Sequence, residues 1–118
     1  MIRKENDPMG QAIYNFYHLK DATPVIVNTS ITVDEELPVS YLFRNYKEMP
    51  LLEKKAMDLV KGRVLDVGAG AGAHSVYLFE KGHQVFSIDV SELSCEVMKS
   101  RGLVNVDTKD IWNLEPQK

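Results

Sequence analysis

Three glycines stand at alternate positions in the stretch RVLDVGAGAGAHS, which runs from Arg63 to Ser75. Gly68, Gly70 and Gly72 follow a branched apolar run and precede a segment of helical character. Glycine permits a positive φ angle and lets a ligand touch the main chain. The free N–H groups at the start of the following helix favour a carboxylate, a phosphate or another polar edge. The stretch therefore predicts a strand-to-helix turn that holds a small polar ligand.

An acidic residue, Asp89, ends the next predicted strand, seventeen residues after Gly72. At that position a carboxylate can accept hydrogen bonds from both hydroxyls of a ribose. Taken singly, glycines near a turn can be packing residues and an acid after a strand can be a helix N-cap. Together, the spacing indicates a ligand that contains a nucleoside.

The spacing also separates two classes of nucleotide ligand. Dinucleotide sites usually read GxGxxG, which leaves room for a pyrophosphate, whereas this loop reads GxGxG. Asp66 stands two residues before Gly68, and its charge would repel a pyrophosphate. A ligand with a cationic or zwitterionic tail fits this acid better.

From Lys61 onward, each predicted strand is followed by a predicted helix. Gly82 and Gly102 close the two helices and Ser91 caps the second. The segments are the strand RVLDV, the helix GAHSVYLFEK, the strand QVFSID, the helix ELSCEVMKSR and the strand LVNVDT. This alternation predicts an α/β, Rossmann-like parallel sheet, and the apolar strands predict helices on both of its faces.

The first sixty residues are predicted to form a cap that precedes the Rossmann-like region. Asp7 and Pro8 start a predicted helix that ends near Lys20, and VIVNTSITVDEELP predicts extended segments or a small hairpin. Two further helices, VSYLFRNY and LLEKKAMDLV, are expected to meet near Met49, the second with an apolar stripe. We expect residues 1–60 to form this helical and extended cap and residues 61–118 to form a partial Rossmann-like domain.

Two of these motifs resemble those of the class I S-adenosylmethionine-dependent methyltransferases. VLDVGAGAG matches the family's first motif, an acid, one residue and GxGxG, and VFSIDVS matches the second. VDTKDIWNL resembles the third motif region. The resemblance covers about residues 61–113 and implies S-adenosylmethionine as the cofactor, with S-adenosylhomocysteine as its product.

The resemblance also implies roles for individual residues. Asp66 would help to hold the methionine part of the cofactor, Asp89 the ribose hydroxyls, and Asp110 the exocyclic amine of the adenine. Asp107, three residues earlier, is a rival for the last role. The remaining contacts would come from the loop and from two apolar side chains beside the adenine: Gly68, Ala69, Gly70, Gly72, Val90 and Ile111.

Five further residues are candidate contacts to cofactor or substrate. Family members commonly lay N-terminal helices over the cofactor, and His74 follows the loop closely, although it also reads as a polar residue of a first helical turn. The candidates are Tyr14, Tyr17, Arg44, Tyr46 and His74. Methyl transfer is in-line attack on an activated methyl group that needs positioning more than a strong acid or base. The sequence therefore names no catalytic residue.

Composition limits the partners. The chain has 118 residues and a net charge of −3, so no basic field favours nucleic acid, and a small-molecule or protein acceptor is expected. One cysteine and the lack of a long apolar run indicate a cytoplasmic protein without a membrane partner. His74, His83 and Cys95 lack the spacing of a metal site, so none is predicted.

Three strands are fewer than the seven of complete family members. We therefore expect an N-terminal fragment of a longer methyltransferase, or a non-catalytic module that binds the cofactor or oligomerises. In both cases the first strand would be an open edge that invites self-association. An NAD(P)-dependent oxidoreductase is the alternative enzyme class.

Overall fold

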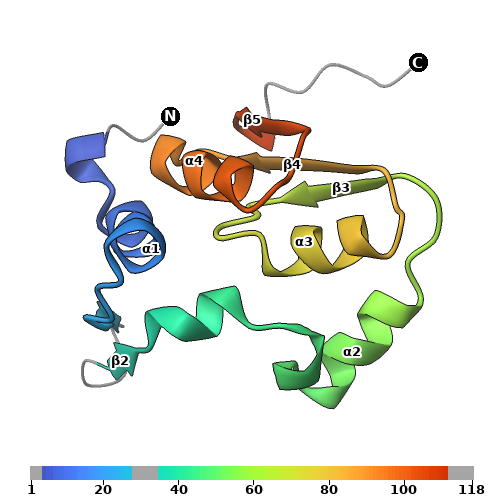
Figure 1. Cartoon of the computed structure of the whole chain (residues 1–118), viewed down its shortest axis with the longest axis horizontal. Helices are drawn as coiled ribbons and strands as arrows, with labels where there is room; N and C mark the ends of the chain where they lie inside the picture. The colour runs from blue at the N-terminus through green and yellow to red at the C-terminus, as the bar shows by residue number, and fades with distance from the viewer. Residues whose placement is uncertain (1–3, 28–34, 112–118) are drawn as a thin grey trace.

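A computed structural model describes residues 4–27 and 35–111 of the chain (Figure 1). The helices are η1 (Lys4–Asn6), α1 (Pro8–Leu19), η2 (Val39–Phe43), η3 (Tyr46–Glu48), α2 (Leu51–Asp58), α3 (Ala73–Glu80) and α4 (Glu92–Ser100), where η denotes a 3₁₀ helix. The strands are β1 (Val25–Val27), β2 (Glu35–Leu37), β3 (Val64–Val67), β4 (Val85–Asp89) and β5 (Val106–Thr108).

Strands β3, β4 and β5 form a parallel sheet in that order, which confirms the predicted α/β parallel sheet. Gly82 and Gly102 adopt positive φ angles of 95° and 103° just after the two helices, as their predicted closing role requires. The Ser91 side chain accepts a hydrogen bond from the N–H of Ser94 and caps α4. The local sequence signals from residue 61 onward therefore predicted the order and the type of these elements correctly.

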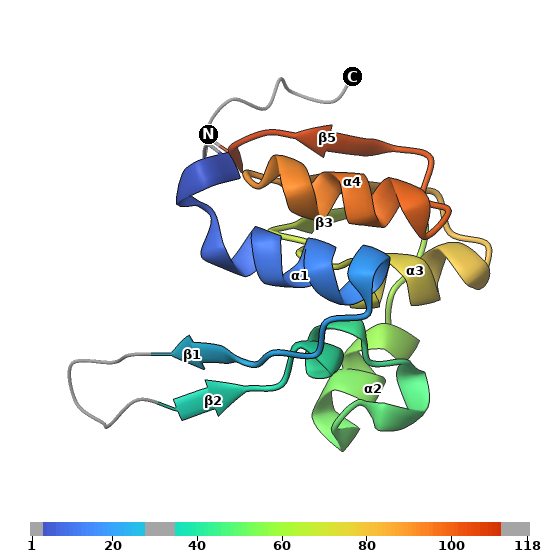
Figure 2. The same ribbon diagram turned by 60° about the vertical axis from the view of Figure 1, so that its left-hand side comes forward.

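The helices cover one face of this sheet. Ser87 faces α3 and is 1% exposed, whereas Leu65 and Val67, which point to the opposite face, are 47% and 44% exposed. Figures 1 and 2 show α3 and α4 on the same side of the strands, with α1 beside α4. The expectation that helices cover both faces is thus wrong for the described part of the chain. Strand β3 is also an edge of the described sheet.

Helix α1 runs alongside α4 and is tied to it at both ends. Asp7 accepts the N–H of Gly10 at 2.9 Å, as an N-cap should, and its other carboxylate oxygen accepts the hydroxyl of Ser91. At the far end, the hydroxyl of Tyr17 donates to the carbonyl of Ser100 at 3.1 Å. The predicted first helix is confirmed, and one side chain, Asp7, helps to cap it while anchoring it to α4.

Gly10 lies inside α1, where alanine is intrinsically the better residue by about 1 kcal/mol. A Cβ at this position would lie 2.1 Å from Asp7 Oδ2 and 2.3 Å from Ser91 Oγ. We therefore expect Gly10→Ala to lower the free energy of unfolding by about 1–3 kcal/mol, because the buried hydrogen bonds must break or shift. Urea unfolding tests this, with Gln11→Ala, an exposed position of the same helix, as the control. Stabilisation by Gly10→Ala would contradict the close approach.

The cap differs from its prediction in one element. β1 and β2 pair as the expected hairpin, although residues 28–34 of that stretch lie outside the described residues. The helix expected over 39–46 is instead two 3₁₀ turns, η2 and η3. They separate at Asn45, which forms a capping box with Glu48 and starts a new turn.

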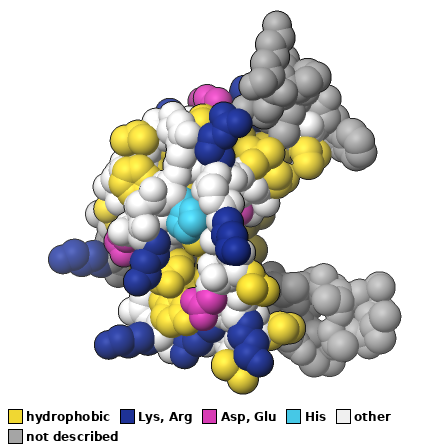
Figure 3. Space-filling model, turned by 90° about the vertical axis from the view of Figure 1, so that its right-hand side faces the viewer, with side chains coloured by type: hydrophobic (Ala, Val, Ile, Leu, Met, Phe, Trp, Pro, Cys, Tyr) yellow, Lys and Arg dark blue, Asp and Glu magenta, His cyan; other side chains and the backbone are white. Residues whose placement is uncertain are grey.

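Helix α2 forms where it is predicted, but its apolar side chains are not buried. Leu51, Leu52 and Leu59 are 69%, 82% and 77% exposed. Figure 3 views the molecule from the side on which α2 lies and shows hydrophobic side chains at the surface there. These three leucines therefore have no covering surface among the described residues. Among those residues, no helix combines the length and apolar character needed to cross a membrane.

Candidate functional site

The three glycines of the loop differ in surroundings. Gly68, Gly70 and Gly72 all have positive φ angles, of 67°, 59° and 87°. A Cβ at Gly68 or Gly70 would meet no atom within 4 Å, whereas one at Gly72 would lie 2.9 Å from Cγ of Met98. The first two positions therefore present bare backbone to open space, and the third glycine is required by packing against α4.

Asp89 lies beside this loop. Its Oδ2 atom accepts the N–H of Gly70 at 2.8 Å, and its Oδ1 atom accepts the N–H of Ser91 at 2.9 Å. The contact arises because the carboxyl ends of the adjacent parallel strands β3 and β4 meet at one edge of the sheet. The structure thus joins two predicted site residues, Gly70 and Asp89, nineteen positions apart.

Asp66 is half-buried at the end of β3 and belongs to a chain of hydroxyl groups. Ser87 donates to Ser75 at 2.7 Å, and Ser75 donates to Asp66 Oδ2 at 2.6 Å. Both serines are buried, at 1% and 0% exposure. Among the described residues, none donates a hydrogen bond to Oδ1 of Asp66. The two serines orient the carboxylate, and no sequence signal identified them.

The segment after β5 returns to the same edge of the sheet. The N–H of Lys109 donates to the carbonyl of Asp89 at 3.0 Å, which places Asp110 and Ile111 next to the strand end. Asp110 is half-buried and Ile111 is 48% exposed. Asp107, the rival acid, lies within β5 and is exposed. Residues 112–114 of the predicted third motif lie outside the described residues.

The two other predicted cofactor contacts have different environments. Val90 is half-buried directly after Asp89. The side chain of Ala69 packs against the core that includes Cys95 and Met98, and its N–H donates to Ile88 at 3.0 Å. Ala69 therefore serves the packing of the loop, and only its backbone lies along the loop surface.

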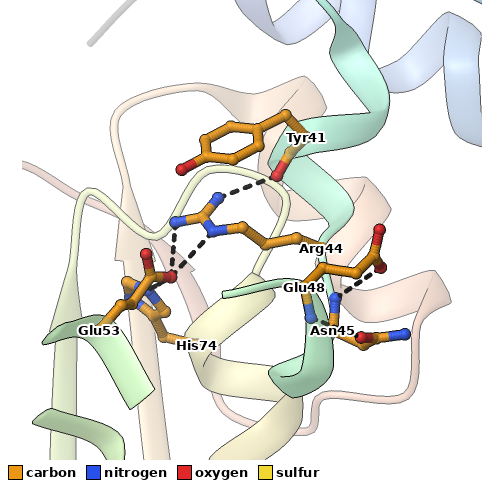
Figure 4. Close-up of polar contacts among 6 residues, drawn as sticks. All are labelled: Tyr41, Arg44, Asn45, Glu48, Glu53 and His74. Atoms are coloured by element: carbon orange, nitrogen blue, oxygen red, sulfur yellow. Dashed lines mark hydrogen bonds and ion pairs between the residues drawn. The ribbon is translucent and has the colours of Figure 1, made fainter. Parts of the chain in front are cut away.

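A cluster of three polar, ionisable side chains lies at the start of α3 (Figure 4). Glu53 Oε1 accepts His74 Nε2 at 2.7 Å, and it also accepts Nε and Nη2 of Arg44, both at 2.8 Å. The guanidinium of Arg44 also donates to the carbonyl of Tyr41 at 2.9 Å. Two predicted residues, Arg44 and His74, are therefore brought together by Glu53, which sequence reasoning had treated only as a charged surface position of a helix.

This cluster joins α2, the turn after η2 and the first turn of α3. Burial alone would raise the pKa of Glu53, but the hydrogen bonds and charges of His74 and Arg44 lower it overall. A carboxylate held in its charged form between two donors is a rigid link. It fastens the cap to the helix that follows the glycine loop.

The lowered pKa of Glu53 gives a testable pH dependence. Above its ordinary value of 4.5, the carboxylate is charged in the folded and unfolded chains, and its stabilisation is fully present. As the pH falls below 4.5, the unfolded chain binds the proton first, and the stabilisation is lost through the lower folded pKa. We expect Glu53→Gln to cost about 1–3 kcal/mol at neutral pH and progressively less in acid. Urea titrations across this range test it against the exposed control Glu5→Gln, and a difference that does not shrink in acid would contradict the ion cluster.

The three tyrosine candidates lie in different places. Tyr14 packs on the cluster that contains Ala71 of the loop, whereas Tyr17 is bonded to the far end of α4. Tyr46 stacks on Tyr77, with ring centroids 4.8 Å apart, and donates to Asp58 at 3.0 Å, a hydrogen bond that raises its pKa. Of the three, only Tyr14 packs against a residue of the glycine loop.

Cys95 is buried, and burial raises the pKa of its thiol, so the reactive thiolate is disfavoured. Within residues 4–27 and 35–111, no group of three or more His, Cys, Asp or Glu residues is arranged to hold a metal ion. The chemistry of the site therefore lies in its backbone, its carboxylates and its hydroxyls.

Comparisons with known proteins identify relatives of one kind. No family model matches the chain. A solved S-adenosylmethionine-dependent methyltransferase from Bacteroides fragilis, in complex with S-adenosyl-L-homocysteine, superposes on 96% of this chain with a TM-score of 0.90 and 44% identity. A 23S rRNA (uracil(747)-C(5))-methyltransferase from Pyrococcus abyssi is 35% identical over 69 residues, 58% of this chain. A 2-heptyl-1-hydroxyquinolin-4(1H)-one methyltransferase from Mycobacteroides abscessus is 40% identical over 60 residues, 46% of this chain.

The chain spans only part of each relative: 47% of the solved structure, and 17% and 26% of the two curated proteins. The alignment with the solved structure nevertheless covers 96% of this chain. The site and the relatives indicate the same class of protein. The site consists of a glycine loop and strand-end acids on a parallel sheet, and all three relatives are methyltransferases. By sequence and by fold, the chain therefore resembles these methyltransferases, as its motifs predict.

Proposed function

We propose that the chain binds S-adenosylmethionine at the glycine loop and is part of an enzyme that transfers the methyl group of this cofactor. The observation that carries this is the contact between Asp89 and the N–H of Gly70, beside two glycines whose backbone faces open space. The Bacteroides fragilis relative, which matches 96% of this chain, is described as a complex with S-adenosylhomocysteine. The residues present fit the same cofactor.

The proposed contacts follow the positions of the side chains. Asp89 takes the ribose hydroxyls, because its oxygens lie at the loop and carry further lone pairs. Asp66 takes the ammonium of the methionine part, for which Oδ1 is the available atom. Asp110, Val90 and Ile111 border the adenine, and the backbone from Gly68 to Gly72 lies along the sugar and the tail. We likewise propose residues 1–60 as the cap and 61–118 as the cofactor-binding region.

The bound cofactor would supply an activated methyl group on a sulfonium. The chain's residues would bind and orient it. Tyr14 from the cap and His74 from the first turn of α3 would border the loop. An in-line transfer of this kind depends on positioning and on the exclusion of water. We assign no acid or base to this chain.

Isothermal titration calorimetry of the 118-residue chain with S-adenosylmethionine, S-adenosylhomocysteine and NADH tests the proposal. Saturable binding of the first two, without binding of NADH, is the expected result. Binding of NADH alone would favour the oxidoreductase alternative, although none of the three relatives described above is of that class. Cofactor binding by a protein that methylates no acceptor would support the non-catalytic module.

The relatives' acceptors differ, since one name specifies an rRNA uracil and the other a quinolone. We propose a small-molecule acceptor or a protein, because the net charge of −3 provides no overall basic field for RNA. We also propose a cytoplasmic location, because the chain has a single, buried cysteine and therefore no intrachain disulfide. A panel of methyl acceptors that includes RNA fragments tests the first proposal.

We propose that this chain self-associates through β3. The strand is an edge of the described sheet, and its own residues Leu65 and Val67 expose apolar side chains. The sedimentation coefficient is expected to rise with concentration, and the double variant Leu65→Lys with Val67→Lys is expected to suppress the rise. Val104→Lys, at a position that is 71% exposed elsewhere, serves as the control. A wild-type chain that stays monomeric at high concentration would contradict this proposal.

A further inference from the structure

A cavity of about 650 Å³ lies between the turn at residues 44–47 and one side of α3. Its charged and aromatic lining consists of Arg44, Tyr46, Lys47, Tyr77, Lys81 and Arg101, together with the carboxylate of Glu80. Four cations therefore face one anion in a chain whose net charge is −3. The cavity is a local concentration of positive charge that the proposed cofactor site does not use.

Arg101 closes the cavity from the end of α4 and is half-buried. Its Nη1 donates to the carbonyl of Ala71 at 2.6 Å, and its guanidinium lies 5.0 Å from the centre of the Phe43 ring. Among the described residues, no carboxylate forms an ion pair with it. Burial also lowers the pKa of Arg101, and the nearby Tyr17 and Glu80 offset this effect only in part. An anion beside it would offset this desolvation.

The other cations of the cavity differ in availability. Arg44 already shares Glu53 with His74, so it contributes charge at one end without being free to reorient. Lys47 and Lys81 form no ion pair within the described part, and the ammonium of Lys81 lies 5.6 Å from the centre of the Tyr77 ring. Figure 3, drawn from the side where α3 ends, shows Lys and Arg side chains over much of that face. Three available cations thus border the same volume.

We propose that this cavity is a binding site for a small molecule that carries a phosphate group. A phosphate offers oxygens for the guanidinium of Arg101 and for both ammonium groups, and its double negative charge matches three cations better than a carboxylate does. The stacked rings of Tyr46 and Tyr77 supply an apolar wall for the remainder of the ligand. Ala73, at the start of α3, lines one end of the cavity and Lys81 the other. The cavity therefore begins beside the glycine loop and extends about 12 Å along α3, at a rise of about 1.5 Å per residue, to cations that have no part in the proposed cofactor contacts.

The test is a titration of the 118-residue chain with inorganic phosphate and with pyrophosphate at constant ionic strength, followed by ¹H–¹⁵N NMR. Saturable shifts of the amides at Tyr77, Lys81 and Arg101 are expected without any cofactor present. Lys81→Gln is expected to weaken binding about tenfold, as loss of one charge-assisted hydrogen bond would, and Arg101→Met more.

Lys99→Gln, which removes an exposed charge of α4 outside the cavity, is the matched control and is expected to leave the affinity unchanged. Lys81→Gln keeps the test decisive if Arg101→Met perturbs the loop through Ala71. Shifts that do not saturate, or an equal loss in Lys99→Gln and Lys81→Gln, would overturn the proposal. Because the ligand is phosphate alone, failure here leaves the result of the S-adenosylhomocysteine titration unaffected.

Discussion

Asp89→Ala is expected to weaken binding of S-adenosylhomocysteine about 100-fold. Hydrogen bonds to a charged group contribute about 1.5–3 kcal/mol each, and two ribose hydroxyls are proposed to share this carboxylate. The substitution also removes the acceptor that holds the N–H of Gly70 at 2.8 Å, so the loop loses its support along with the ligand contact. Calorimetric titration of the variant measures the loss.

Two controls separate these effects. Asp107→Ala removes an exposed acid from the neighbouring strand β5 and is expected to bind normally. Asp89→Asn keeps an oxygen for Gly70 but removes the charge, so it is expected to fall between the wild type and Asp89→Ala. Wild-type affinity in Asp89→Ala would exclude this carboxylate as the ribose acceptor.

Asp66→Ala is expected to weaken binding of S-adenosylhomocysteine by about 10- to 100-fold. Here the proposed partner is the ammonium of the methionine tail, and one charge-assisted contact to a half-buried carboxylate is lost. S-adenosylhomocysteine carries this tail, whereas adenosine does not. The variant is therefore expected to lose affinity for S-adenosylhomocysteine and to keep that for adenosine.

Ser75→Ala provides a graded comparison for Asp66. It removes the hydroxyl that donates to Oδ2 at 2.6 Å and leaves the carboxylate in place. We expect a smaller loss of affinity, since Ser75 acts only by orienting Asp66. Equal losses for S-adenosylhomocysteine and adenosine in Asp66→Ala would contradict the proposed orientation of the ligand.

The elements around the site could be predicted because their signals are local. Asp7 with Pro8 marks the start of α1, Ser91 marks the start of α4, and glycines with positive φ close both helices of the sheet region. The GxGxG loop and the strand-end Asp89 have fixed places in a βαβ unit. Their meeting follows from the parallel pairing of β3 and β4.

The contacts that complete the site could not be predicted in this way. Glu53 is separated from His74 by 21 positions, and Ser87 from Ser75 by 12, so their pairing depends on how helices pack. A serine in a strand and a glutamate in an amphipathic helix have no distinctive local pattern. Such residues become recognisable only when the packing of the helices is known.

Two differences from the predicted burial, the exposed leucines of α2 and the uncovered second face of the sheet, have a common cause. The apolar residues of α2 and of the second sheet face fit a buried pattern, but burial needs a partner surface, and the described residues supply none for Leu52 or Leu65. Periodicity indicates which face is apolar and does not indicate what covers it. The 3₁₀ turns were missed because the capping box at Asn45 interrupts a segment too short to sustain a helix.

The most direct test of the proposed cofactor site is a ¹H–¹⁵N NMR titration of the wild-type chain with S-adenosylhomocysteine. Saturable shifts are expected at the amides of Gly68, Gly70 and Asp89, with little change at Gly82 beyond the far end of α3. Shifts confined to other regions, or an unchanged spectrum from a folded chain at saturating ligand, would contradict the proposal that this loop holds the cofactor.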